Sequence, residues 1–202
     1  MNSVHDIGGM HGFGPIIRDD APFHFPWEVR VRAIAMALIR RGVYNIDEFR
    51  RAIECLPPAR YLTLTYFERW LAAVQMLLVE KGQFTADEIE GLAQQPAQDA
   101  TRAERPRRSD TPAVTETVAE AAQTPQAPAR AGTARFGVGD NVVAKNRHTR
   151  EHTRLPRYLR GKRGVVSKVH GVYVFPDTNA HGRGRNPEPV YSVHFAARDV
   201  WG

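Results

Sequence analysis

The sequence predicts an α+β protein in which a helical part and a β-rich part are joined by a linker. Apolar residues recur at helical spacing before residue 95, the stretch 96–134 contains no aromatic residue, leucine or isoleucine, and short segments rich in valine and aromatic residues follow it. We therefore divide the 202 residues into an N-terminal arm (1–26), a helical domain (27–95), a flexible linker (96–134) and a small β-barrel (135–202).

The arm has little intrinsic preference for helix or strand. It contains four glycines followed by a proline, at Gly8, Gly9, Gly12, Gly14 and Pro15. It also brings aromatic side chains that are costly to leave in water, at Phe13, Phe23 and Phe25, with Trp27 directly after it. We expect an extended segment whose course is set by a surface that it lies against.

The first helix is expected between Trp27 and Gly42, because a glycine tolerates the positive φ that often ends a helix. Val31, Ile34 and Leu38 follow one another at helical spacing and form its apolar face.

Three further helices are predicted from capping boxes, in which a polar N-cap residue and a glutamate three positions later satisfy free backbone amides. The pairs are Asn45 with Glu48, Thr65 with Glu68 and Thr85 with Glu88. The first of these helices should end before Pro57 and Pro58, and the second should reach Gly82. Their apolar faces contain Ile46, Phe49, Ile53 and Leu56, and then Phe67, Trp70, Leu71, Val74, Leu77 and Leu78.

Four short strands are expected after the linker, at 139–145, 164–169, 171–175 and 190–195. Each is bounded by Gly, Pro, Asn or Asp, and their spacing suggests an antiparallel barrel. The linker itself, with Arg107 and Arg108 as a solvated pair, lacks the apolar surface needed to order itself.

Composition limits the cellular compartment, the cysteine chemistry and the kinds of partner that we expect for this protein. A single cysteine, Cys55, excludes an internal disulfide and a cysteine-rich metal site. No signal peptide or membrane-spanning run is seen, so we expect a cytoplasmic protein. Residues 131–202 carry 13 Lys and Arg against 5 Asp and Glu. Such a basic part suits nucleic acid, an acidic protein surface or an anion held by a partner, and charge alone does not choose among them.

Four segments together resemble the β subunit of nitrile hydratase: HDIGGMHGFGP (5–15), HTRLPRYLRGKRGVV (152–166), HGVYVFPDTNAHGRG (170–184) and VYSVHFAARDVWG (190–202). The resemblance implies an SH3-like barrel in the C-terminal part and an arm that wraps over an α subunit, in an αβ dimer or an α2β2 tetramer. The sequence stops at Gly202, where such subunits usually continue into a further strand, so we expect a truncated C-terminus.

The resemblance also implies a reaction and a division of labour. The enzyme adds water to a nitrile to give an amide at a Co(III) or Fe(III) ion, which the α subunit holds in a loop with two oxidised cysteines. This chain would bind no metal itself. It would supply Arg50 and Arg154, whose guanidinium groups hydrogen-bond the oxidised cysteine oxygens. The segment DEFR (47–50) favours a cobalt-type member.

The positions that would line the nitrile pocket, by the same resemblance, are Ile46, Phe49, Tyr66 and Trp70. Each residue also has a plainer interpretation. Arg50 could pair with Glu54 one helical turn on, and Arg154 could be one more solvated charge in a basic run. Ile46, Phe49 and Trp70 lie in core stripes, whereas Tyr66 lies outside the stripe of its helix.

Two other functions are compatible with parts of the sequence. A basic barrel containing GKRGVVSKVHG (161–171) resembles RNA-binding SH3-like modules, although these leave the helical domain unexplained. An accessory protein that activates nitrile hydratase would normally match only one of the two parts. His148 and His152 are four residues apart, but the basic surroundings and nearby Pro156 disfavour a metal pair.

Overall fold

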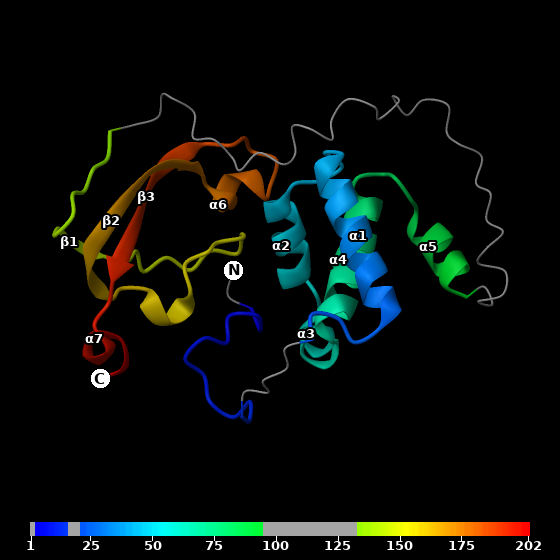
Figure 1. The fold of residues 1–202 in the computed structure, drawn as a ribbon, viewed down its shortest axis with the longest axis horizontal. Coiled ribbons are helices and arrows are strands. Elements are labelled where there is room, and N and C mark those ends of the chain that lie inside the picture. The colour runs from blue at the N-terminus through cyan, green and yellow to red at the C-terminus, as the bar shows by residue number, and fades with distance from the viewer. Residues whose placement is uncertain (1–2, 16–20, 95–132) are drawn as a thin grey trace.

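The computed structural model describes residues 3–15, 21–94 and 133–202, which form a helical half and a sheet half that lie side by side (Figure 1). This confirms the predicted α+β class. The predicted linker, with Arg107 and Arg108, falls outside the described residues apart from its last two positions. None of the helices in these ranges has the length and apolar character needed to cross a bilayer.

The helical half contains α1 (Pro26–Arg40), α2 (Ile46–Glu54), α3 (Pro58–Thr63), α4 (Tyr66–Glu80) and α5 (Ala86–Ala93). The sequence predicted all of these except α3, because the pair of prolines was interpreted only as the end of α2. That interpretation was incomplete. Pro58 occupies the first turn of α3, where a missing backbone N–H costs nothing, so the prolines end one helix and begin the next.

The predicted caps and stops are present. Asn45 Oδ1 accepts hydrogen bonds from the backbone amides of Asp47 and Glu48, and the Glu48 carboxylate accepts one from the Asn45 amide at 2.7 Å. The amides of Thr65 and Thr85 donate to Glu68 and Glu88 in the same way, at 2.7 and 2.8 Å. Gly42 and Gly82 follow α1 and α4 with φ of +67° and +65°. Local sequence therefore fixes where these helices begin and end.

The core of the helical half lies between α1, α2 and α4. Its fully buried members are Ala35, Tyr44, Phe49, Ala52, Ala73, Val74 and Leu77. Burial raises the pKa of Tyr44 to about 12, and its hydroxyl donates to the Ala35 carbonyl. The predicted inward position of Ile34 was wrong, because Ala35 takes that place and leaves Ile34 exposed. Since Val29 is exposed as well, α1 presents apolar side chains to the outside.

The sheet half is a three-stranded antiparallel sheet in the order β1 (Asn141–Val143), β2 (Arg163–Val174), β3 (Pro187–His194). The sequence predicted two strands where β2 runs without a break. Gly171, with φ of +90°, does not end the strand, because shifts in register near Lys168 and Gly171 absorb the irregularity while pairing with β3 continues. The described strands form an open sheet, so closure into a barrel stays a prediction.

Three short helical segments complete the sheet half. They are the 3-10 turn η1 (Arg157–Leu159), α6 (Pro176–Asn179) and α7 (Ala197–Trp201), and the sequence did not predict them. In Figure 1, α6 lies between the sheet and α2. It thus joins the two halves.

The arm contains no helix or strand over residues 3–15, as predicted, and part of it is held by the sheet half. The Asp6 carboxylate accepts the Arg157 backbone N–H at 3.0 Å and lies 3.6 Å from Nη2 of Arg160. Tyr158 and Trp201 stack with ring centroids 5.1 Å apart. The two rings approach the backbone at Gly8 and Gly9 so closely that a Cβ at either position would lie 2.6 Å from a ring carbon.

Alanine at Gly9 should detach the arm from α7. Gly9 has φ of +76° and contacts the Trp201 ring, whereas Gly12 has φ of +95° with no atom within 4 Å of a Cβ. Gly12→Ala is therefore a control with a similar backbone cost and no clash. Hydrogen–deuterium exchange of residues 3–10 should be faster by at least about 5-fold in Gly9→Ala than in Gly12→Ala. Equal exchange in the two variants would contradict this contact.

Candidate functional site

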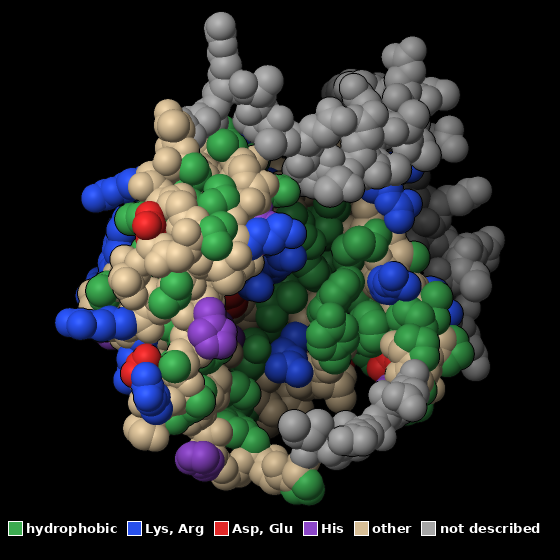
Figure 2. Space-filling model, turned by 60° about the vertical axis from the view of Figure 1, so that its left-hand side comes forward, with side chains coloured by type: hydrophobic (Ala, Val, Ile, Leu, Met, Phe, Trp, Pro, Cys, Tyr) green, Lys and Arg blue, Asp and Glu red, His purple; other side chains and the backbone are tan. Residues whose placement is uncertain are grey.

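The candidate site lies where α2 faces the loop that precedes η1. A hollow of about 290 Å³ opens here, and its lining includes Glu54 from α2, His5 and Asp6 from the arm, and Arg154 from the loop. Figure 2 shows the hollowed face between the two halves, with hydrophobic side chains in its depth and Lys and Arg side chains near its edge. Parts of the chain that are distant in sequence therefore meet at one predicted arginine.

A buried histidine and a carboxylate connect α2 to this loop. His152 is 0% exposed, and its Nδ1–H donates to Glu54 Oε2 at 2.7 Å. The backbone N–H of His152 donates to Nε2 of His181 at 3.1 Å, which requires that nitrogen to be unprotonated. His5 Nε2 lies 3.7 Å from the same oxygen of Glu54. These contacts fix the backbone two residues before Arg154.

Arg50 is oriented by a second link between the halves. Its Nη1 donates to Asp47 Oδ1 at 3.2 Å, and the other oxygen of Asp47 accepts from Asn179 Nδ2 at 2.8 Å. Asn45 Nδ2 donates to the Asn179 carbonyl at 3.0 Å. The alternative pairing of Arg50 with Glu54 is wrong, because His152 holds the Glu54 carboxylate. Arg50 nevertheless keeps an exposed guanidinium.

Arg154 lines the hollow, and its guanidinium is uncommitted among the described residues, as are those of Arg147 and Arg150 in the same loop. Arg160 lies against Asp6, and Arg183 is paired with Glu151, which lowers the pKa of that carboxyl. Within residues 3–15, 21–94 and 133–202, Arg154 is exposed and makes no ion pair or side-chain hydrogen bond. An exposed cation at the edge of a polar hollow can accept an anion brought by another molecule.

Acidification should destabilise this junction. Burial lowers the pKa of His5 despite the nearby Glu54 carboxylate, and burial together with the charge of Arg51 lowers the pKa of His181. Each imidazole then binds fewer protons in the folded state than in the unfolded state. The stability that these two neutral imidazoles contribute is therefore fully present above the ordinary histidine pKa of 6.5, and it is lost as the pH falls below that value.

Urea denaturation across pH 5 to 8 checks this sign. The free energy of unfolding should be level above about pH 7 and should decrease toward pH 5. Glutamine at both His5 and His181 should flatten the slope, because the amide does not titrate in this range. A variant that keeps the whole slope would assign it to other groups.

The four residues predicted to line a substrate pocket lie on α2 and α4, and three of them belong to one row of rings. Phe49 meets Trp70 edge-on with centroids 4.9 Å apart, and Trp70 lies 5.5 Å from Tyr66. Phe49 is 2% exposed and belongs to the core, whereas Tyr66 is 58% exposed and Ile46 is also exposed. The row of rings therefore runs from the buried Phe49, which precedes Arg50 in the sequence, to Tyr66 at the molecular surface.

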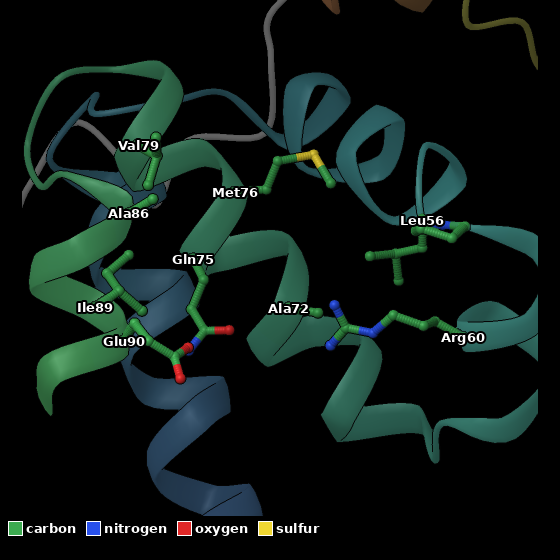
Figure 3. A pocket seen from close by; sticks show the side chains of 10 residues that line it. Leu56, Arg60, Ala72, Gln75, Met76, Val79, Ala86, Ile89 and Glu90 are labelled. Atoms are coloured by element: carbon green, nitrogen blue, oxygen red, sulfur yellow. The ribbon is translucent and has the colours of Figure 1, made fainter. Parts of the chain in front are cut away.

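A separate apolar groove of about 330 Å³ lies between the end of α2, α4 and α5. Figure 3 shows Met76, Val79 and Ile89 around it, with Arg60 and Glu90 as its charged members. Its lining contains none of the residues predicted to bind the substrate or the cysteine oxygens. The groove is therefore distinct from the candidate site.

The structure places the two histidines once considered as a metal pair in different contacts. His152 contacts Glu54, and Nδ1 of His148 lies 3.1 Å from a nitrogen of Arg160. Among the residues whose positions are described, no three His, Cys, Asp or Glu side chains are grouped so as to hold a metal ion.

Sequence reasoning missed the residues that orient the arginines. Glu54 and His152 are 98 positions apart, and nothing local in the sequence connects them. The contact of Asn179 with Asp47 spans 132 positions. Only the pairing of Asp47 with Arg50 could have been found, because the two are three residues apart on a helix.

Comparison with known proteins gives matches along the whole chain. The model of the N-terminal domain of the nitrile hydratase beta subunit matches residues 1–130, and that of the C-terminal domain matches residues 124–202. Nitrile hydratase subunit beta of Pseudomonas putida is 40% identical over all of this chain and 90% of its own length.

Two further relatives have names that include a metal. The low-molecular weight cobalt-containing nitrile hydratase subunit beta of Rhodococcus rhodochrous is 40% identical over all of this chain and 91% of its own length. The cobalt-containing nitrile hydratase subunit beta of Pseudonocardia thermophila is 35% identical, with coverage of 100% and 88%.

Proposed function

Because the chain belongs to the nitrile hydratase β-subunit family, we propose that it completes a nitrile-hydrating site at its contact with an α subunit, using Arg50 and Arg154. Nitrile hydratases add water across the carbon–nitrogen triple bond to give an amide. The observation that carries the proposal is the junction of α2 with the loop before η1, where His152 contacts Glu54 two residues before Arg154 and Asp47 holds the guanidinium of Arg50.

The two arginines would bind the oxidised cysteine oxygens of the α subunit. Such oxygens carry negative charge, and a planar guanidinium offers two parallel N–H donors that stay charged at any working pH. Arg154 is exposed and makes no pair with the described residues of this chain, so it can donate hydrogen bonds to these oxygens without breaking an existing pair. Arg50 is held by Asp47, which limits the directions its remaining N–H groups can take. Held by both arginines, the oxidised cysteine oxygens would keep a single orientation, and their basicity would not vary with their position.

Tyr66, Trp70 and Ile46 would form the wall along which an apolar nitrile lies. The exposure of Tyr66 and Ile46 leaves them free to contact a substrate. Phe49 is buried, so its part would be to hold the Trp70 ring edge-on from below. Aromatic walls of this kind suit small apolar ligands, since rings bury area and limit orientation.

We propose that the metal is cobalt and that the α subunit holds it, since two of the relatives are named cobalt-containing. The residues described in this chain do not provide a ligand set. When bound, the metal would act as a Lewis acid toward the nitrile or the water. The part of this chain is to neutralise and orient the groups around the metal.

The remaining features of the assembly are proposed from the same family. The arm (1–26) would lie over the α subunit, the helical domain would be 27–95 and the linker 96–134, and the sheet half (135–202) would form an SH3-like barrel of which β1 to β3 are three strands. The assembly would be an αβ dimer or α2β2 tetramer. A cytoplasmic location is proposed from the single cysteine.

Co-expression of this chain with its α-type partner in cobalt medium tests the proposal. A complex that co-purifies and forms the amide from acetonitrile is expected, and neither chain alone should be active. A chain that raises the activity of a partner and then separates from it would instead be an accessory protein. Salt-dependent binding of RNA without any complex would make the sheet half a nucleic-acid module.

A further inference from the structure

The end of α6 is bound to the first turn of α2, which carries Arg50. The side-chain amide of Asn179 donates to Asp47 Oδ2 at 2.8 Å, while Asp47 Oδ1 accepts from Arg50 at 3.2 Å. The Asn179 carbonyl accepts from Asn45 Nδ2 at 3.0 Å, so both the side chain and the backbone of Asn179 contact α2. Because Asp47 is only 7% exposed, the donor on one of its oxygens determines which oxygen faces Arg50.

Two residues further on, the same segment is bound to the loop that carries Arg154. Nε2 of His181 accepts the backbone N–H of His152 at 3.1 Å, two residues before Arg154. The intervening Ala180 is 1% exposed, so its surroundings leave the segment little room to shift. Because Glu54 binds the side chain of His152 and His181 binds its backbone, the loop is held at two points. Residues 179–181 therefore contact the supports of both arginines.

Both contacts are made by groups without charge. Asn179 offers a neutral amide, and burial together with the charge of Arg51 lowers the pKa of His181, which favours its neutral imidazole. A charged donor in place of Asn179 would compete with Arg50 for the Asp47 carboxylate. Neutral groups can thus orient the supports and leave the charge of each guanidinium for a ligand.

We propose that Asn179 and His181 are positioning residues that set the spacing between Arg50 and Arg154, so that both guanidinium groups reach the oxygens of one small anionic centre. The inference rests on the proposed function and deepens it. Arg50 lies on α2 and Arg154 in the loop before η1, so a movement of either element changes their separation. A misplacement of about 1 Å at a reacting centre can cost about 100-fold in rate.

Alanine at Asn179 in the co-purified αβ complex tests the link to Arg50. With acetonitrile as the substrate, kcat should fall by about 3- to 30-fold, while KM changes less than about twofold. In an Arg50→Lys complex the same substitution should lower kcat by less than about twofold, because the fork to be positioned is already absent. Asn141→Ala removes an exposed asparagine from β1 and should leave kcat unaltered. If the losses from Asn179→Ala and Arg50→Lys multiply in full, the proposal is overturned.

Two substitutions at His181 test the link to Arg154. Leucine removes the acceptor of the His152 N–H, so His181→Leu should lower kcat by about 3- to 30-fold. His181→Gln keeps an acceptor oxygen and should recover at least about half of the activity. In an Arg154→Lys complex, His181→Leu should lower kcat by less than about twofold. Equal losses with leucine and glutamine would contradict a role for this acceptor.

A measurement other than activity separates positioning from stability. Co-purification and cobalt content should be retained, and the charge-transfer absorption of the cobalt–sulfur centre should shift in the same direction in Asn179→Ala as in Arg50→Lys. Asn141→Ala should leave this absorption unchanged. Activity lost in proportion to cobalt or to complex would overturn the proposal and make residues 179–181 purely structural. If the unaltered complex forms no amide, or if lysine at both arginines leaves full activity, the proposed function itself has failed.

Discussion

Lysine in place of Arg154 is expected to lower kcat of the assembled enzyme by about 10- to 100-fold, with little change in KM. Lysine keeps the positive charge but loses the planar fork, so it cannot bind two oxygens in parallel. Arg154 is exposed and makes no pair within the described parts of this chain, so the substitution should leave its fold intact. Arg50→Lys should have a similar effect, because its pairing with Asp47 places the fork.

The control for this prediction is Arg198→Lys on α7, whose side chain is 86% exposed. That variant should keep full activity. Co-purification with the α subunit and the cobalt content of the complex should be retained in all three variants. A loss of activity would then be due to the orientation of the cysteine oxygens and not to failed assembly of the complex. Full activity of Arg154→Lys would mean that charge alone is sufficient and that the fork has no role.

Alanine in place of His152 is expected to reduce the free energy of unfolding by about 3–5 kcal/mol, because it leaves the Glu54 carboxylate buried without its donor. Activity should fall too, since the same contact fixes the loop that carries Arg154. Glu54→Gln should cost less, because the amide oxygen can still accept from Nδ1. Urea denaturation measures the stability, and amide formation measures the effect on the site.

Glu80→Gln provides a matched control for a carboxylate in an ion pair. Glu80 accepts from Arg51 at 2.7 Å, but its side chain is 45% exposed. Loss of an exposed pair should cost no more than about 1 kcal/mol. If His152→Ala behaves like this control, the two halves are held together by other contacts, and the Glu54 to His152 bond does not fix the loop.

Local sequence was sufficient for the elements whose ends are set by neighbouring residues. The capping pairs at Asn45, Thr65 and Thr85 give the correct starts of α2, α4 and α5, because each satisfies amides within three positions. The same logic failed at Pro58, which is compatible with both the end and the start of a helix. It also failed at Gly171, where pairing with a distant strand keeps β2 continuous.

The candidate site shows a similar division. Arg50 and Arg154 were found through resemblance, but their surroundings depend on contacts that only the folded chain creates. The plainer interpretation of Arg50 paired it with Glu54, at the common spacing of four residues. In the structure Glu54 lies against His152, and Arg50 takes Asp47 instead. The choice between two acceptors on one helix was made by a residue from the other half of the chain.

The contacts of Tyr158 and Trp201 with the arm also determine when the arm can dock during synthesis of the chain. Asp6 is made 151 residues before Arg157, to which it is bound, and at 5–20 residues per second the two emerge about 8–30 s apart. The interval between the synthesis of Gly9 and that of Trp201, which it contacts, is longer still. Throughout this time the arm has none of its docking surface from the sheet half, while α1 to α4 can already pack. The arm is therefore made before the helices but can be placed only after the sheet half has been made.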